Sequence, residues 1–120
     1  MGTVLQLTII IGALFFVINF FLPVRGVLNI TIDEAKSKFK DTSIQFVDVR
    51  TAHEFGANRK NPFINIPLTA LRKRINELDK NKEVVVICQI GMRSVKASRI
   101  LKKHGFEKIR IIKGGMSTWI

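Results

Sequence analysis

Cysteine is almost absent from this sequence, because its 120 residues include only Cys88. A lone cysteine cannot form a disulfide within the chain, which agrees with a reducing compartment. Structural zinc normally takes four ligands, and neither His53 nor His104 stands at a ligand spacing from Cys88. The sequence therefore excludes a disulfide scaffold and predicts neither a metal site nor a cofactor.

Tyrosine, tryptophan and acidic residues are also scarce. The chain has no Tyr, one Trp and 9 acidic residues against 20 Lys and Arg, which gives a formal net charge of +11. This charge favours an anionic partner, such as an anionic membrane leaflet, a small anionic substrate or nucleic acid. Base stacking needs exposed aromatic side chains, and most Phe residues beyond position 24 fall in apolar patterns. We therefore expect no nucleic-acid partner.

Charged side chains are missing from residues 1–24, and Pro23 marks the end of this stretch. As a helix, two dozen residues would measure about 36 Å, which exceeds the hydrocarbon core of about 30 Å. A cleaved signal peptide would need a basic start and a small-residue cleavage site, and a buried core helix would need a polar face. Because these features are lacking, we expect a single transmembrane anchor over residues 1–24.

Positive charge follows the uncharged stretch. Arg25, Lys36, Lys38 and Lys40 come soon after it, and no Lys or Arg precedes it. Positive residues that flank a membrane segment mostly stay in the cytoplasm. The sequence therefore predicts a single-pass protein of the cell membrane, with a domain over residues 25–120 on the cytoplasmic side.

Residues 25–120 alternate short β-branched runs with helical patterns and contain no internal repeat. Predicted strands cover residues 28–30, 44–49, 64–66, 84–88 and 109–112, and predicted helices cover 31–39, 53–55, 67–78 and 94–104. The run VVVIC at residues 84–88 lacks alternation, as expected for a central strand covered on both faces. This order predicts an α/β fold with a mainly parallel five-stranded sheet flanked by helices and preceded by one transmembrane helix.

Cys88 ends the predicted central strand, at the edge where open α/β sheets bind ligands. Amides of the following turn converge there and stabilise an anion. Gly91 permits a positive φ in this turn, and Arg93 adds a permanent positive charge. These features favour a reactive thiolate, with a buried structural cysteine as the alternative.

The loop CQIGMRS at residues 88–94 resembles the active-site loop of single-domain rhodanese-like sulfurtransferases, which has the pattern Cys-x-x-Gly-x-Arg-Ser. Three further segments resemble motifs of that family in the same order: DVRTAHEF at 48–55, NIPL at 65–68 and KGGMSTW at 113–119. The segment RKNPF at 59–63 departs from the family pattern, which predicts an unusual rim of the pocket.

The resemblance implies an enzyme that moves sulfane sulfur from thiosulfate or a persulfide donor to a thiol acceptor. Together with the predicted anchor, this gives a membrane-anchored sulfurtransferase. Cys88 would be the catalytic nucleophile and would carry the sulfur as a persulfide. The implied substrate-binding residues are those of the same loop: Gln89, Ile90, Gly91, Met92, Arg93 and Ser94. Their amides would hold the persulfide charge, and Arg93 would orient the anionic donor.

Five residues outside the loop are expected to have supporting roles. Asp48 and Arg50 would buttress the surroundings of the loop, Gly114 and Gly115 would form a turn, and Trp119 would pack in the core.

Two alternatives to the sulfurtransferase remain open. One is a phosphatase or arsenate reductase on the same fold, because an amide cradle with Cys and Arg also suits tetrahedral oxyanions. The spacing from Cys88 to Arg93 is Cys-x4-Arg, whereas the resemblance implies Cys-x5-Arg for cysteine phosphatases. The other is a non-catalytic module at the membrane that carries persulfide or binds a partner. The sequence names no protein partner.

Overall fold

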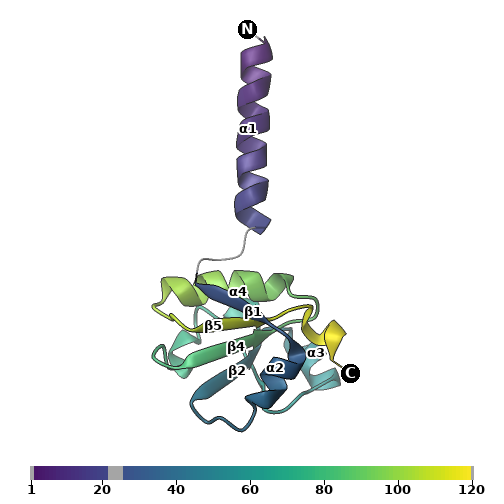
Figure 1. The fold of residues 1–120 in the computed structure, drawn as a ribbon, viewed down its shortest axis with the longest axis vertical. Coiled ribbons are helices and arrows are strands. Elements are labelled where there is room, and N and C mark those ends of the chain that lie inside the picture. Colours follow the sequence, from purple (N-terminus) through teal and green to yellow (C-terminus); the bar gives the residue numbers. More distant parts are fainter. Residues whose placement is uncertain (1, 22–25, 120) are drawn as a thin grey trace.

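The computed structural model describes residues 2–21 and 26–119, and its central feature is one parallel β-sheet (Figure 1). The sheet has five strands in the order β1-β5-β4-β2-β3, and every neighbouring pair is parallel. The strands are β1 (Val27–Ile30), β2 (Ile44–Asp48), β3 (Ile64–Asn65), β4 (Glu83–Ile87) and β5 (Ile109–Ile112). The predicted α/β fold with a five-stranded sheet is confirmed.

Helices and short 3-10 turns connect these strands. The helices of the domain are α2 (Ile32–Ser37), α3 (Ala52–Ala57) and α4 (Met92–Lys103), and the 3-10 turns are η1 (Leu68–Ala70), η2 (Ile75–Glu77) and η3 (Gly115–Thr118). Two of the helices begin with a capping box, formed by Thr31 with Glu34 in α2 and by Thr51 with Glu54 in α3. Each box satisfies backbone N–H groups that have no partner inside the helix, so it fixes where the helix begins.

The helix predicted over residues 67–78 is wrong. The segment forms η1 and η2 instead, joined by a turn, and its bonds include Ala70 N–H to the Pro67 carbonyl at 2.8 Å. The apolar residues Leu71 and Leu78, which are spaced as on one face of a helix, are nevertheless buried. A spacing of three residues also fits 3-10 turns, so burial did not distinguish the two structures.

Both faces of the sheet are covered by apolar side chains. On one face, Val84 and Val86 of β4 pack in a cluster with Leu71, which follows η1, and with Leu101 of α4. On the other face, Val85 and Ile87 belong to a second cluster that includes Phe46 and Met116. The central position of β4 and its cover on both faces agree with the unbroken apolar run in the sequence.

The segment at residues 59–63 contributes to the core rather than only to a pocket rim. Phe63 is buried, and its ring meets that of Phe46 edge-on with centroids 5.4 Å apart. The Trp119 ring stacks on the Phe39 ring with centroids 5.8 Å apart, as expected for a packing role. The departure from the family pattern therefore changes an aromatic cluster at the second face of the sheet.

The N-terminal apolar segment forms the helix α1 (Gly2–Phe21), which projects from the domain (Figure 1). The side chains described along it, up to Ile18, are exposed. Within the described residues, however, we find no helix with the length and apolar character needed to cross a membrane. The predicted helix is therefore present, whereas the predicted membrane span is not shown. Residues 1 and 22–25, which include the predicted end at Pro23 and the start of the domain at Arg25, lie outside the described residues.

Candidate active site

Cys88 follows β4 directly and lies at the carboxyl edge of the sheet, where the sequence placed it. Its side chain is fully buried, and its Sγ accepts a hydrogen bond from the Gly91 amide at 2.8 Å. Gly91 has a φ of 100°, and this left-handed conformation turns the loop back over the sulfur. An N–H group aimed at sulfur stabilises a negative charge there. The loop thus places one backbone donor directly on the Cys88 sulfur.

The turn η3 holds the Cys88 loop from the other side. The Met116 amide donates to the Cys88 carbonyl at 2.7 Å, and the Ser117 amide donates to the Gln89 carbonyl at 3.1 Å. Gly115 makes this approach possible, because a Cβ at this position would collide with the Cys88 carbonyl. The sequence predicted a glycine turn here, but it gave no signal that this turn supports the loop.

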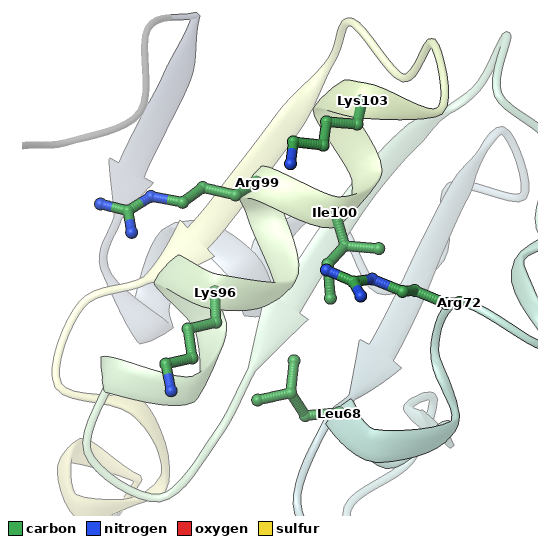
Figure 2. Close-up of a pocket in the computed structure, with 6 residues that line it drawn as sticks. All are labelled: Leu68, Arg72, Lys96, Arg99, Ile100 and Lys103. Carbon is green, nitrogen blue, oxygen red and sulfur yellow. The ribbon is translucent and has the colours of Figure 1, made fainter. Parts of the chain in front are cut away.

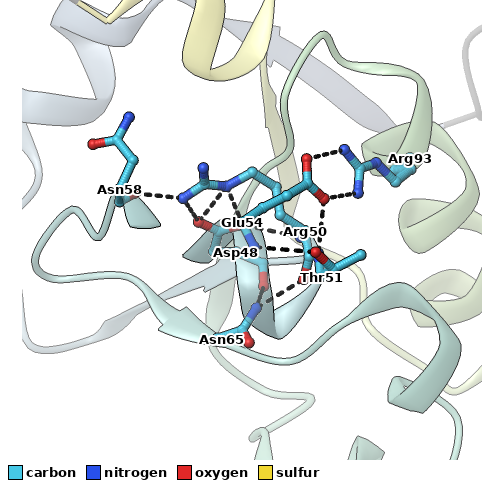
Figure 3. Close-up of polar contacts among 7 residues, drawn as sticks. All are labelled: Asp48, Arg50, Thr51, Glu54, Asn58, Asn65 and Arg93. Atoms are coloured by element: carbon cyan, nitrogen blue, oxygen red, sulfur yellow. Dashed lines mark hydrogen bonds and ion pairs between the residues drawn. The ribbon is translucent and has the colours of Figure 1, made fainter. Parts of the chain in front are cut away.

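Arg93 is bound by Glu54, which comes from α3 on the opposite side of the site (Figure 3). Arg93 Nη1 lies 2.6 Å from Glu54 Oε1, and Nη2 lies 2.9 Å from Oε2. Glu54 also accepts a hydrogen bond from the Thr51 amide at 3.1 Å. The carboxylate therefore holds the guanidinium and caps α3 at the same time.

This pairing affects the charges of both groups. The hydrogen bonds from Arg93, and then from the Thr51 amide, lower the pKa of Glu54 to about 2. The hydrogen bond to Glu54 raises the pKa of Arg93, and the charge of Cys88 contributes in the same direction. The sequence assigned Arg93 to the donor and missed Glu54, although the spacing of Thr51 and Glu54 was a visible capping box.

Asp48 and Arg50 form a buried ion pair beneath this edge of the sheet (Figure 3). Arg50 Nη2 lies 2.8 Å from Asp48 Oδ2 and donates to the Asn58 carbonyl at 2.7 Å. Asn65 Nδ2 donates to the backbone carbonyls of Asp48 and Arg50 at 3.0 and 2.9 Å. These bonds tie the ends of β2 and β3 together, in agreement with the expected supporting role of Asp48 and Arg50.

The remaining loop residues divide by exposure. Gln89, Ile90 and Met92 are exposed, with Ile90 at 62% and Met92 at 56%. Ser94 is fully buried, and its hydroxyl has no hydrogen-bond partner among the described residues. The described residues contain no group of three His, Cys, Asp or Glu side chains placed to hold a metal ion.

Comparisons with known proteins identify relatives of most of this chain. Residues 31–120 match the family model described as Rhodanese-like domain. A Bacillus subtilis protein named "Putative sulfur carrier protein YrkF" is 37% identical over 92 residues, which cover 76% of this chain and 50% of that protein. A protein of Allochromatium vinosum named "Sulfurtransferase" is 27% identical over 92 residues, which cover 76% of this chain and 86% of that protein.

A solved structure shows the same likeness. The NAD-dependent persulfide reductase from A. fulgidus matches with a TM-score of 0.65 and 40% identity, over 80% of this chain and 16% of that chain. This chain thus spans half the length of YrkF and a smaller share of the reductase. At the level of the family, the relatives support a sulfurtransferase role and imply a sulfur donor and a sulfur acceptor.

Proposed function

This chain belongs to the rhodanese-like domain family, and we propose that it transfers sulfane sulfur through a persulfide on Cys88. The observation that carries the proposal is the hydrogen bond from the Gly91 amide to Cys88 Sγ at 2.8 Å, at the carboxyl end of the central strand. The donor N–H is fixed by the left-handed backbone of Gly91, so it requires no rearrangement to meet a charged sulfur.

The reaction has two displacement steps. In the first, the Cys88 thiolate attacks the outer sulfur of the donor, the donor's S–S bond breaks, and sulfite or a thiolate leaves. The Cys88 persulfide that results keeps the negative charge on its outer sulfur. In the second, an acceptor thiolate attacks that outer sulfur, the S–S bond at Cys88 breaks, and the thiolate of Cys88 is restored. No net oxidation occurs, because one S–S bond forms for each that breaks.

The surroundings of Cys88 favour a persulfide donor over free thiosulfate. Thiosulfate carries an anionic sulfonate that would need a cation, and the two terminal nitrogens of Arg93 already donate to Glu54. Ile90 and Met92 are exposed beside the cysteine, so they offer an apolar surface to a donor that has an organic or protein body. Both donor classes stay within the proposal, with thiosulfate as the poorer one.

A sulfur carrier is the second candidate. The relative YrkF is named as a sulfur carrier protein, and the complete burial of Cys88 would protect a persulfide from solvent. A carrier would form the persulfide once and release it only to a specific protein. A phosphatase or arsenate reductase has less support, because Arg93, which would bind the oxyanion, is already paired with Glu54.

Turnover with purified full-length protein distinguishes these candidates. We expect repeated sulfur transfer from a low-molecular-weight persulfide to cyanide or a thiol, lost in Cys88→Ser, and no hydrolysis of an aryl phosphate. A single turnover that stops at the persulfide would establish the carrier instead. Aryl phosphate hydrolysis that depends on Cys88 would establish the phosphatase.

We also propose that α1 attaches the domain to a cell membrane, with the domain on the cytoplasmic side. The support is the exposure of apolar side chains along α1, such as Leu5, Ile9 and Phe15 at 61 to 68%, which is unfavourable in water. Lys36, Lys38 and Lys40 follow the helix closely, as on the cytoplasmic side of membrane proteins.

Cell fractionation tests the attachment. The full chain should stay in the membrane pellet after carbonate extraction, and a variant with Ile9, Leu14 and Phe15 each changed to Asn should move to the supernatant. Protease added outside intact spheroplasts should leave the domain uncut. Recovery of the unchanged chain in the supernatant, or digestion from outside, would contradict the location.

A further inference from the structure

A pocket lies between α4 and the segment formed by η1 and the turn that follows it (Figure 2). Its volume is about 220 Å³, and none of the residues of the Cys88 loop lines it. The lining residues are two apolar and four basic ones: Leu68, Ile100, Arg72, Lys96, Arg99 and Lys103. The proposed sulfur chemistry gives this pocket no role.

The charges around the pocket have one sign. Lys96 and Lys103 extend from α4, and Arg72 reaches toward α4 beside Ile100 from the opposite wall (Figure 2). Among the described residues, no acidic side chain lines the pocket, and the sequence of α4 contains no acidic residue. An anion that lies between Arg72, Lys96 and Lys103 would be attracted by all three cations.

The apolar residues and the size narrow the ligand class. Leu68 and Ile100 lie between the basic side chains, so one part of a ligand would meet apolar surface (Figure 2). The volume of about 220 Å³ is below the range of about 300–1,000 Å³ that is typical of sites for drug-sized ligands. A small group with an anionic end and a short carbon portion fits both features.

We propose that this pocket binds a phosphate ester. Arg72 would contact the phosphate oxygens with its planar guanidinium, which matches that geometry, and Lys96 and Lys103 would add two point charges. The carbon portion of the ester would pack on Leu68 and Ile100. The ester has two possible sources: the head group of an anionic phospholipid and a soluble phosphate ester. This inference is independent of the sulfur transfer proposed for Cys88.

The test compares two triple variants of the full chain in a mild detergent. The pocket variant is Arg72→Gln with Lys96→Gln and Lys103→Gln. The control variant is Lys40→Gln with Lys82→Gln and Lys108→Gln, which removes the same charge from exposed positions outside the pocket. Equal melting temperatures of the two variants would show that the pocket substitutions leave the fold intact.

The soluble source is measured by titration with glycerol 3-phosphate, with glycerol as the uncharged probe. The lipid source is measured by flotation with vesicles of phosphatidylcholine, with and without phosphatidylglycerol. The apolar helix α1 can bind both kinds of vesicle. The pocket is therefore measured by the increase in floated protein that phosphatidylglycerol causes, compared between the pocket variant and the control variant.

We expect wild type and the control variant to bind in at least one arm, and the pocket variant to lose at least about tenfold in affinity there. Binding of glycerol 3-phosphate identifies a soluble ester, and the phosphatidylglycerol effect identifies a lipid head group. The proposal is overturned if wild type binds in neither arm, or if the pocket variant binds as well as the control variant.

Discussion

Arg93 and Glu54 meet across the site through two parallel hydrogen bonds, with Nη1 2.6 Å from Oε1 and Nη2 2.9 Å from Oε2. The two residues are 39 positions apart in the chain, and their side chains are about one-third exposed. The pair joins α3 to the beginning of α4, beside the Cys88 loop. It therefore controls how available the guanidinium is to an anionic donor.

The first prediction concerns this availability. Glu54→Gln removes the carboxylate charge that holds Arg93, so the guanidinium can turn toward thiosulfate. We expect KM for thiosulfate to fall several-fold, while KM for an uncharged persulfide changes little. Steady-state kinetics with each donor measures the two KM values.

Glu77→Gln is the matched control, because Arg74 and Glu77 form a similar two-bond pair on the surface at 2.6 and 2.9 Å. This control should leave both KM values unchanged. An unchanged KM for thiosulfate in Glu54→Gln would show that the pair does not limit access to Arg93.

The second prediction concerns pH. The pKa of Glu54 is about 2 in the folded protein, lowered from 4.5 chiefly by Arg93. A lowered folded-state pKa contributes stability that is fully present above about pH 4.5 and is lost as the pH falls toward 2. The stability difference between wild type and Glu54→Gln should therefore be constant near neutral pH and should shrink below about pH 4.5. Urea unfolding of both proteins over this pH range measures the difference in their free energies of unfolding. A difference that grows as the pH falls would contradict the prediction.

The third prediction concerns the support of the Cys88 loop by η3. Gly115→Ala places a Cβ against the Cys88 carbonyl, and Gly115 has a φ of 58°. We expect lower thermal stability and a loss of most sulfur transfer, because the loop must shift. Gly56→Ala is the control, since a Cβ there has no neighbour within 4 Å. The control should be neutral or slightly stabilising, because Ala is better than Gly in a helix by about 0.5–1 kcal/mol. Equal activity of the two variants would remove η3 from its supporting role.

The fourth prediction concerns Ser94, whose buried hydroxyl has no partner among the described residues. A buried hydroxyl without a partner is unfavourable, so Ser94→Ala should keep or raise the melting temperature. Ser98→Ala should lower the melting temperature, because the Ser98 hydroxyl donates to the Val95 carbonyl at 2.6 Å. The loss of this hydrogen bond should reduce the free energy of unfolding by about 1 kcal/mol.

Activity separates two roles of the Ser94 hydroxyl. If it serves the persulfide, Ser94→Ala lowers the rate of sulfur transfer although its stability is unchanged, which is what we expect. A fully active Ser94→Ala would show that the hydroxyl has no part in the reaction.

The sequence predicted the strands and the Cys88 loop well, because both depend on local patterns. The apolar run at residues 84–88 is typical of a strand covered on both faces, and Gly91 marked the turn that follows it. Residues 67–78 were predicted less well, because an apolar spacing of three or four residues suits a helix and consecutive 3-10 turns alike.

The contacts that complete the site could not be read from local patterns. Glu54 meets Arg93, and Gly115 meets Cys88, only because parallel strands bring distant loops to one edge of the sheet. The capping box of α3 already explains why a glutamate stands at position 54. Nothing in the local sequence therefore indicated that Glu54 also binds Arg93. The membrane location, predicted from the uncharged start of the chain, remains a proposal.

The central claim is that Cys88 carries sulfur as a persulfide, and intact-mass spectrometry of the full chain tests it most directly. After incubation with a persulfide donor, wild type should gain about 32 Da, the mass of one sulfur, and should lose it again on addition of cyanide or a thiol acceptor. Cys88→Ser should gain nothing under the same conditions. A wild type that gains no sulfur, or a Cys88→Ser variant that gains it, would contradict the account.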